Sequence, residues 1–516
     1  MAALTFHSWL LAAVVFAAGI WLYNRHNDFP CFYHPDEPKK ARQVIEGEFN
    51  FKHPLLLLQA TRVAGWINRQ PLTPQPVTET GRMVSALFTS AAIVCFVLLA
   101  AHLYGTVAAA CVGALLLANS HLYELAHYMK EDPALAFGIG AFFLTMTRCW
   151  LRPSIVRFAL LGAAAALAVS AKYAGAIVVP IAFVPLFWLR EERGRKALAL
   201  CTAFVVAVVL VNFPIFFTSL SSLLGNVGRE VDFTVHGEAG LTRRVPHGVY
   251  TAVFVGATNP VIWILLGVYY LRFFKFFRSI HPAEWLLALF PILYMVILSF
   301  LPKTNHRYFL PDTLIFCTLA AFGLFSFSLG GSARLTRAVQ AACFLAAFGI
   351  FVARLIPYDF AFRVDTRQQL LAFIRENVPP DATIAQDRRV RLPSRTEPRD
   401  ADSTDFLAQK VVGGDFAADP GGIDALRARG VSYVAVSEAE YGRFFLPNHK
   451  PSKSVQANYD RQRTFYEHLF RDGKLLWECK AGLLPILQPH IRLYYLPPGD
   501  HGAPSRIKAR GNRMFA

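Results

Sequence analysis

The sequence predicts a polytopic α-helical membrane protein followed by a small C-terminal α/β domain. Hydrophobic residues make up 54% of the 516 residues and charged residues only 17%, whereas soluble chains carry charge at about a quarter of their positions. Apolar runs long enough to cross a bilayer recur between residues 8 and 355. After Tyr358 these runs stop, and Asp, Arg, Gly and Pro become frequent. The boundary between the two parts is therefore expected at residues 357/358.

The membrane part, residues 1–357, is expected to contain about eleven spanning helices. The first apolar run lacks a basic segment before it and a small-residue cleavage site after it, which favours a retained helix over a cleaved signal peptide. The expected spans are 8–24, 83–103, 106–120, 132–148, 155–171, 173–190, 197–218, 249–271, 284–301, 309–329 and 336–355. The sequence contains no recognisable internal repeat.

Basic residues gather in every second short loop between these spans. The loops are Arg148–Arg157, Arg190–Lys196, Arg272–Arg278 and Arg334–Arg337. Lys and Arg in short loops face the cytoplasm and anionic lipid, which places the N-terminus inside. The first long loop and the C-terminal domain would then lie outside. The net charge of +17 is explained by these loops, so no nucleic-acid partner is expected.

The two outer regions have secondary structure of their own. In the first long loop, 38–49 and 53–67 read as amphipathic helices that lie in the membrane interface. The C-terminal domain, residues 358–500, alternates helical and strand patterns, which predicts an α/β domain. The helices are expected at 368–377, 423–429 and 459–471, and the strands at 381–386, 432–437, 475–479 and 491–496. The basic tail, 501–516, is expected to be disordered.

Two acidic clusters lie at the outer edge of the predicted membrane region, where charged side chains are costly. The first is His34-Pro35-Asp36-Glu37-Pro38 and the second is Lys130-Glu131-Asp132-Pro133. An acidic residue before proline is also a common helix start, so a capping role is an alternative for each.

Three cationic segments are predicted on the same side. They are Lys52-His53-Pro54, Lys172-Tyr173 and Asn305-His306-Arg307-Tyr308. Snorkelling of a long basic side chain to water or lipid headgroups is an alternative, and it is favoured for Lys172. Carboxylates facing a cationic pocket at a membrane surface suit transfer from a lipid phosphate. One carboxylate would take the proton of an acceptor hydroxyl while Lys and Arg neutralise the departing phosphate.

In their order and sidedness these motifs resemble the GT-C glycosyltransferases. The motifs are the acidic pair after the first helix, the Lys-His-Pro segment, the Glu-Asp-Pro segment and Arg307-Tyr308-Phe309-Leu310-Pro311. The similarity covers about residues 1–355, and it is greatest to the bacterial protein O-mannosyltransferase and aminoarabinose transferase group, related to glycosyltransferase family 39. The chain lacks the Trp-Trp-Asp motif of oligosaccharyltransferases and the β-trefoil domain of eukaryotic O-mannosyltransferases.

The resemblance implies an inverting enzyme of the bacterial inner (plasma) membrane. It would transfer a sugar from a polyprenyl-phosphate donor to a hydroxyl of a lipid, glycan or protein acceptor on the periplasmic face. Some members bind a divalent cation such as Mg or Mn, and the sequence leaves a metal open because it has no clear ligand cluster. The implied roles are Asp36 as catalytic base with Glu37 beside it, Asp132 as a further acidic site residue, Lys52, Arg307 and Tyr308 as donor-phosphate contacts, and His53, Glu131, Lys172 and His306 as pocket lining.

Two other function classes are alternatives. A transporter or flippase would show repeats and ionisable residues near the bilayer midplane, whereas here the charges gather at one face. A glycan ligase or polymerase that uses lipid-pyrophosphate donors would rely on Arg and His in a large outer loop. The loop 219–248 keeps that class open, with Arg229, His236, Arg243, Arg244 and His247.

Overall fold

The computed structural model describes residues 4–30, 33–189, 191–219, 221, 224–229, 231, 259–299, 306–327, 332–394, 406–446, 451 and 456–497. The chain divides into two compact units, one built from residues 1–238 and 242–360 and the other from residues 239–241 and 361–516. The division falls between Phe360 and Ala361, three residues past the expected boundary, because helix α17 (Ala333–Ala361) runs through the expected position.

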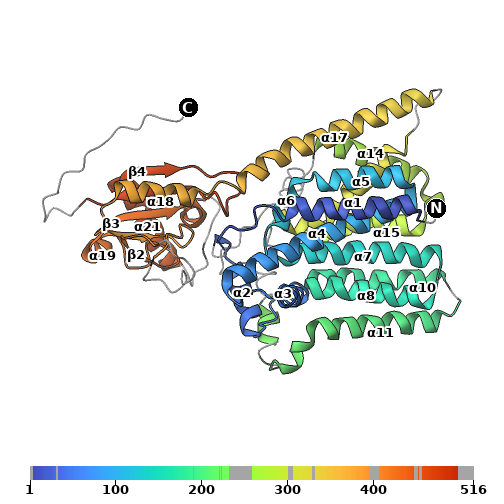
Figure 1. The fold of residues 1–516 in the computed structure, drawn as a ribbon, viewed down its shortest axis with the longest axis horizontal. Coiled ribbons are helices and arrows are strands. Elements are labelled where there is room, and N and C mark those ends of the chain that lie inside the picture. Colours follow the sequence, from blue (N-terminus) through green and yellow to red (C-terminus); the bar gives the residue numbers. More distant parts are fainter. Residues whose placement is uncertain are drawn as a thin grey trace. The chain divides into compact units, whose positions relative to one another are not determined.

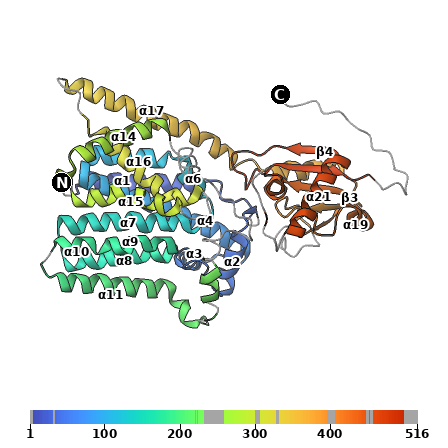
Figure 2. The same cartoon turned by 180° about the vertical axis from the view of Figure 1, so that it is seen from behind.

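The first unit is a bundle of apolar helices, as the hydrophobic runs predict (Figures 1 and 2). Its long helices pack in the sequence α1, α4, α7, α8, α11, with α5, α14, α15 and α16 completing the bundle. The bounds are α1 Phe6–Tyr23, α4 Pro74–Tyr104, α5 Thr106–Leu117, α6 Ser120–Ala126, α7 Glu131–Leu151, α8 Ile155–Ala171, α9 Val178–Ala182, α10 Val184–Trp188, α11 Arg193–Asn212, α14 Pro260–Lys275, α15 Pro282–Ser299 and α16 Leu310–Leu324; short 3₁₀ turns are η2 Tyr173–Ile177, η3 Phe213–Phe217, η4 Phe277–Ser279 and η5 His306–Phe309.

Where the structure describes them, the eleven expected spans correspond to a helix or to a series of short helices. Residues 249–258 of the span 249–271, 300–301 of 284–301 and 328–329 of 309–329 lie outside the described residues. By length and composition five helical stretches could cross a membrane, or six if the bent pair α5 and α6 forms one span. The count of about eleven crossings therefore stays a prediction, since several helices are shorter. The expected span 106–120 ends early: the chain bends by 60° between α5 and α6, where the Asn119 side chain accepts the backbone N–H groups of His121 and Leu122 and starts a new helix.

Small residues let the central helices approach closely. A Cβ atom on Gly162 of α8 would lie 2.1 Å from the Leu200 carbonyl oxygen of α11. One on Gly138 of α7 would lie 2.5 Å from the Ala168 Cα of α8. Backbones in contact at small residues are typical of helix packing inside membranes, where apolar burial gives little driving force and van der Waals contact dominates.

The first long loop forms the two expected juxtamembrane helices, α2 (Glu37–Glu46) and α3 (Leu56–Ile67). Leu56, Leu57 and Leu58 of α3 are buried, whereas Trp66 is 81% exposed. In both views α2 and α3 lie at one end of the bundle, together with α6 (Figures 1 and 2). The marked N-terminus and the connection from α10 to α11 lie at the opposite end.

The second unit is a five-stranded mixed sheet with helices, which confirms the expected α/β domain. The strand order is β2-β1-β3-β5-β4, with β1 parallel to β2 and β3, and β5 antiparallel to β3 and β4. The elements are α18 Thr366–Asn377, β1 Thr383–Gln386, β2 Lys410–Gly413, α19 Ile423–Ala428, β3 Val431–Ser437, α20 Glu438–Tyr441, η7 Gly442–Phe444, α21 Gln456–Asp472, β4 Lys474–Cys479 and β5 Ile491–Tyr495. Strand β2 and helix α20, each four residues long, were not expected.

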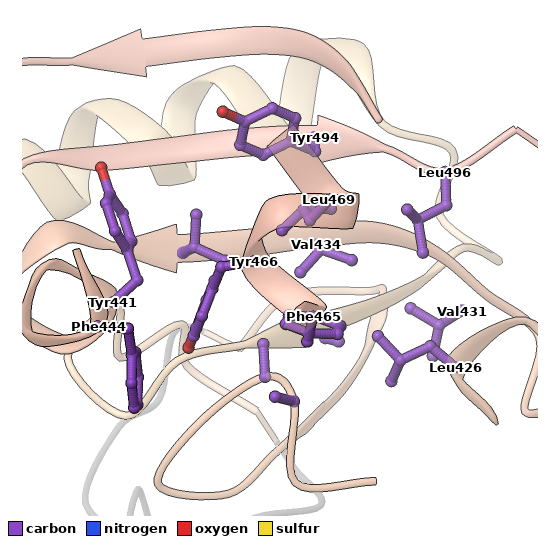
Figure 3. Packing of buried hydrophobic residues seen from close by; sticks show 14 of the residues in the cluster. Leu426, Val431, Val434, Tyr441, Phe444, Phe465, Tyr466, Leu469, Tyr494 and Leu496 are labelled. Atoms are coloured by element: carbon purple, nitrogen blue, oxygen red, sulfur yellow. The ribbon is translucent and has the colours of Figure 1, made fainter. Parts of the chain in front are cut away.

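An aromatic core joins α21 to this sheet. Tyr466 and Leu469 of α21 are fully buried against Val434 of β3 and Tyr494 of β5 (Figure 3). Buried Asp387, directly after β1, accepts hydrogen bonds from the Ala417 and Ser437 amides and from the Tyr466 hydroxyl. Burial raises the pKa of Asp387 to about 7. The carboxyl thereby ties β1, β3 and α21 together. The expected tail 501–516 lies outside the described residues.

Candidate functional site

The candidate site forms where α2, the start of α7 and the turn η5 meet. Asp36 immediately precedes α2 and makes no side-chain cap hydrogen bond with it, so capping does not account for its carboxylate. Its backbone N–H donates to His34 Nδ1 at 3.1 Å. The Asp36 side chain is half-exposed, at 47%, which leaves it open to a substrate.

Two cations face the Asp36 carboxylate. Lys130, at the start of α7, pairs with Asp36 Oδ2, and its side chain is only 3% exposed. Arg307 Nη1 lies 4.0 Å from the same oxygen. Arg307 also lies 3.9 Å, through Nε, from Asp132 Oδ2. Arg307 therefore bridges the two acidic clusters, which are 96 residues apart by their numbering.

The acidic pair at the start of α7 is held by two further lysines. Lys40 Nζ lies 2.7 Å from Glu131 Oε1, and Lys172 Nζ lies 2.7 Å from Asp132 Oδ1. The Lys172 ammonium also lies 4.4 Å from the ring centroid of Tyr308. Snorkelling, the reading that the sequence favours for Lys172, is wrong: its ammonium points to Asp132 and its side chain is only 17% exposed.

Glu37 does not share this environment. Its side chain is fully buried and receives two hydrogen bonds from Arg82, Nε to Oε1 at 3.1 Å and Nη2 to Oε2 at 2.6 Å. The Met129 amide donates to Oε1 at 2.8 Å. Arg82 in turn donates to the carbonyl oxygens of Asn27 and Phe29. These contacts hold α2 against α4 and engage both carboxylate oxygens of Glu37; the catalytic role expected for Glu37 stays a prediction.

Lys52 and His306 lie at the margin of the cluster. The Lys52 side chain is exposed, and no ion pair of its ammonium is found among the described residues. His53 lies within electrostatic range of Glu131. His306 Nε2 lies 3.5 Å from Glu124 Oε1, and its ring lies 5.5 Å from that of His121. Of the loop residues on which the ligase alternative rests, Arg229 is exposed and donates to the Gly225 carbonyl oxygen and to Asn226 Oδ1. The others, His236, Arg243, Arg244 and His247, lie outside the described residues.

Neighbouring charges determine the ionisation of the half-exposed Asp36 and of Arg307. Burial alone would raise the pKa of Asp36, but Lys130, His34 and Lys40 hold it well below its usual range. Burial also acts against the charge on Arg307, yet Asp132, Tyr308 and Asp36 raise its pKa. Asp36 is therefore a carboxylate and Arg307 a cation at neutral pH.

The described residues do not favour a metal. No group of three or more His, Cys, Asp or Glu side chains among them could hold an ion. Asp36, Glu131 and Asp132 are each paired with a lysine instead. Because each carboxylate is already paired with a lysine, these side chains do not fit the oxygen cage that Mg or Mn requires.

Three residues of the cluster region were not predicted: Lys40, Arg82 and Lys130. Each is buried, at 6%, 0% and 3% exposure, and each pairs with a predicted carboxylate. Lys130 directly precedes Glu131-Asp132 in the sequence, and this adjacency was the signal that could have found it. Arg82 stands in the first turns of a long apolar helix, where an ionisable residue indicates a buried partner.

Comparison with known proteins identifies the fold. Residues 76–218 match the family model described as dolichyl-phosphate-mannose-protein mannosyltransferase. The crystal structure of ArnT from Cupriavidus metallidurans in the apo state matches with a TM-score of 0.54 at 14% identity, covering 94% of this chain and 97% of that one. The apo oligosaccharyltransferase of Archaeoglobus fulgidus matches with a TM-score of 0.55 at 12% identity, covering 93% and 80%. No relative is found among curated proteins.

Proposed function

Because the chain has the GT-C fold of membrane glycosyltransferases, we propose that it transfers a sugar from a polyprenyl-phosphate donor to a hydroxyl acceptor. The acceptor is a lipid, a glycan or a protein, and the reaction takes place at the periplasmic face of the inner membrane. Two observations on relatives support the donor class: the matching family model describes dolichyl-phosphate-mannose enzymes, and the archaeal AglB structure contains a dolichol-phosphate.

The observation that carries this proposal is the bridge that Arg307 makes between Asp36 and Asp132. It brings a half-exposed carboxylate and a guanidinium together at the end of the bundle where α2 and α3 lie. A guanidinium binds two phosphate oxygens at once. Arg307 is therefore the donor-phosphate ligand, and Tyr308 beside it lines the phosphate subsite. Glu131 and His53, which lies within electrostatic range of it, would border the bound donor, and so would His306, next to Arg307 in the chain.

In the reaction Asp36 takes the proton of the acceptor hydroxyl. The acceptor oxygen then forms a bond to the anomeric carbon of the sugar while the bond from that carbon to the phosphate oxygen breaks. The configuration inverts, since one base acts opposite the leaving group. The electron pair stays on the departing polyprenyl phosphate, whose charge Arg307 neutralises. Asp132, held by Lys172, orients Arg307 and the sugar hydroxyls.

The test is Asp36→Asn in proteoliposomes supplied with undecaprenyl-phosphate sugars and an envelope fraction as acceptor. Loss of the base should lower the rate of transfer about 10²- to 10⁴-fold without loss of folded protein. Glu46→Gln is the matched control, because Glu46 ends the same helix and is exposed; its rate should equal that of the wild type. A fully active Asp36→Asn enzyme would remove Asp36 as the base.

A further inference from the structure

Two neighbouring helices, α4 and α2, fix the position of Lys130, the lysine that pairs with Asp36. The backbone N–H of Lys130 lies 3.4 Å from Ser85 Oγ of α4. The preceding residue, Met129, is held through its amide by Glu37 and through its carbonyl by Lys40 at 2.9 Å. Lys130 is thus fixed at the start of α7, and its ammonium reaches the side of Asp36 that faces Arg307.

The side chains around Asp36 carry a net positive charge, which favours the binding of an anion. Four cations, Lys40, Lys130, Lys172 and Arg307, face the three carboxylates of Asp36, Glu131 and Asp132. Glu131 and Asp132 are buried and pair with one lysine each. Arg307 lies between Asp132 and Asp36, and Lys130 approaches the same Asp36 oxygen as Arg307 does. The excess positive charge therefore lies next to the most exposed carboxylate of the cluster.

The same crowding acts on the protonation of Lys130. Burial and the positive charges of Arg307 and Lys40 lower the pKa of Lys130 to about 7, against the opposing effect of Asp36 and Glu131. A phosphate oxygen beside its ammonium would favour the charged form again. An incoming anion beside Lys130 would therefore stabilise the charged form of its side chain.

We propose that Lys130 exchanges partners during the reaction, from Asp36 in the donor-free protein to the donor phosphate in the donor complex. The donor phosphate takes both Lys130 and Arg307, and Asp36 is released to accept the hydroxyl proton. The acceptor is then activated only when a donor is bound, so that Lys130 keeps the base inactive in the empty site. This inference rests on the proposed function and adds to it a second phosphate ligand other than the exposed Lys52.

Binding of undecaprenyl phosphate to the purified full-length protein tests the first half of the exchange. Lys130→Met keeps the length of the side chain and removes its charge, and should weaken binding about 10- to 100-fold, the loss expected for a charged hydrogen bond. Lys39→Met, an exposed cation on α2, is the control and should bind as the wild type does. Unchanged binding by Lys130→Met, or an equal loss in Lys39→Met, would overturn the proposal. So would Lys52→Met weakening binding while Lys130→Met does not.

Asp36→Asn tests the competition itself and does not depend on Lys130→Met folding. Without the carboxylate, Lys130 has lost its competing partner, so undecaprenyl phosphate should bind several-fold tighter than to the wild type although transfer is lost. Equal or weaker binding would contradict the exchange.

The pH profile separates this role from a purely structural one. Lys130→Met removes the cation that lowers the pKa of Asp36, so the acidic limb of kcat/KM should move to higher pH, whereas Lys130→Arg should keep the wild-type limb. If the wild type binds undecaprenyl phosphate in a Lys130-dependent way but transfers no sugar, the proposed function is wrong and the phosphate site at Lys130 stands. In another outcome the wild type transfers sugar, but Lys130→Met binds undecaprenyl phosphate with wild-type affinity and keeps the wild-type acidic limb of kcat/KM. That result would reject the role of Lys130 and keep the proposed function.

Discussion

At the scale of single residues, neighbouring carboxylates have different environments. Asp36 is half-exposed beside Lys130 and Arg307, whereas Glu37 is fully buried and paired with Arg82. The two side chains follow each other in the sequence, but the start of α2 turns them to different sides. Of the two, Asp36 is the carboxylate that is exposed, and Glu37 is the one that forms a buried ion pair between α2 and α4.

This difference in environment predicts opposite phenotypes for Glu37→Gln and Asp36→Asn. Glu37→Gln should lower the free energy of unfolding by about 3 kcal/mol, because it leaves the buried Arg82 charge without its counterion. The kcat of the protein that remains folded should change little. Thermal unfolding in detergent, with kcat corrected for folded protein, measures both quantities, and Asp36→Asn is the matched comparison. A Glu37→Gln protein of normal stability and lost kcat would restore Glu37 to the catalytic residues.

At the scale of elements, close helix contacts determine whether the start of α7 is placed correctly. Helix α7 carries Lys130, Glu131 and Asp132 at its start and packs on α8, which packs on α11. Lys172, directly after α8, reaches Asp132. Any separation of these helices therefore changes the distances within the charged cluster as well as the stability of the bundle.

Gly162→Ala should separate α8 from α11. The added Cβ would lie 2.1 Å from the Leu200 carbonyl oxygen, and backbone cannot yield as a flexible side chain does, so a loss of about 1 to 3 kcal/mol is expected. Gly267→Ala on α14 is the control, because a Cβ there has no heavy atom within 4 Å and alanine favours the helix by up to about 1 kcal/mol. The midpoint of thermal unfolding compares the two; equal midpoints would contradict the close contact.

At the scale of the whole molecule, the helical unit has two chemically different ends. The charged cluster lies with α2 and α6, and the connection from α10 to α11 lies at the other end with the N-terminus (Figure 1). The basic loops Arg148–Arg157 and Arg190–Lys196 connect helices at that other end, as alternating sidedness requires. The orientation predicted from the basic loops would place the charged cluster on the side away from the cytoplasm.

Single cysteines test this sidedness in a background from which the eight native cysteines have been replaced. Lys39→Cys on α2 and Arg193→Cys at the start of α11 are both at exposed positions. An impermeant thiol reagent added to intact cells should label Lys39→Cys only, and both after permeabilisation. Labelling of both in intact cells, or of Arg193→Cys alone, would reverse or break the predicted topology.

The sequence by itself determined the apolar helices, the C-terminal α/β domain, the two juxtamembrane helices and the segments that carry charge. Each of these depends on local patterns: hydrophobic runs, the alternation of helix and strand periodicity, and ionisable residues where the bilayer makes them costly. The four-residue strand β2, Lys410–Gly413, was missed, whereas the equally short β1 was predicted.

Only the tertiary structure decided which cation meets which carboxylate. Arg82 and Glu37 are 45 residues apart, Lys172 and Asp132 are 40 apart, and Lys130 and Asp36 are 94 apart. At such separations a choice between Lys52 and Lys130, both next to predicted motifs, depends on how the helices pack. Burial then sets the free-energy cost of keeping each side chain charged, because that cost depends on the surroundings that the ion enters from water.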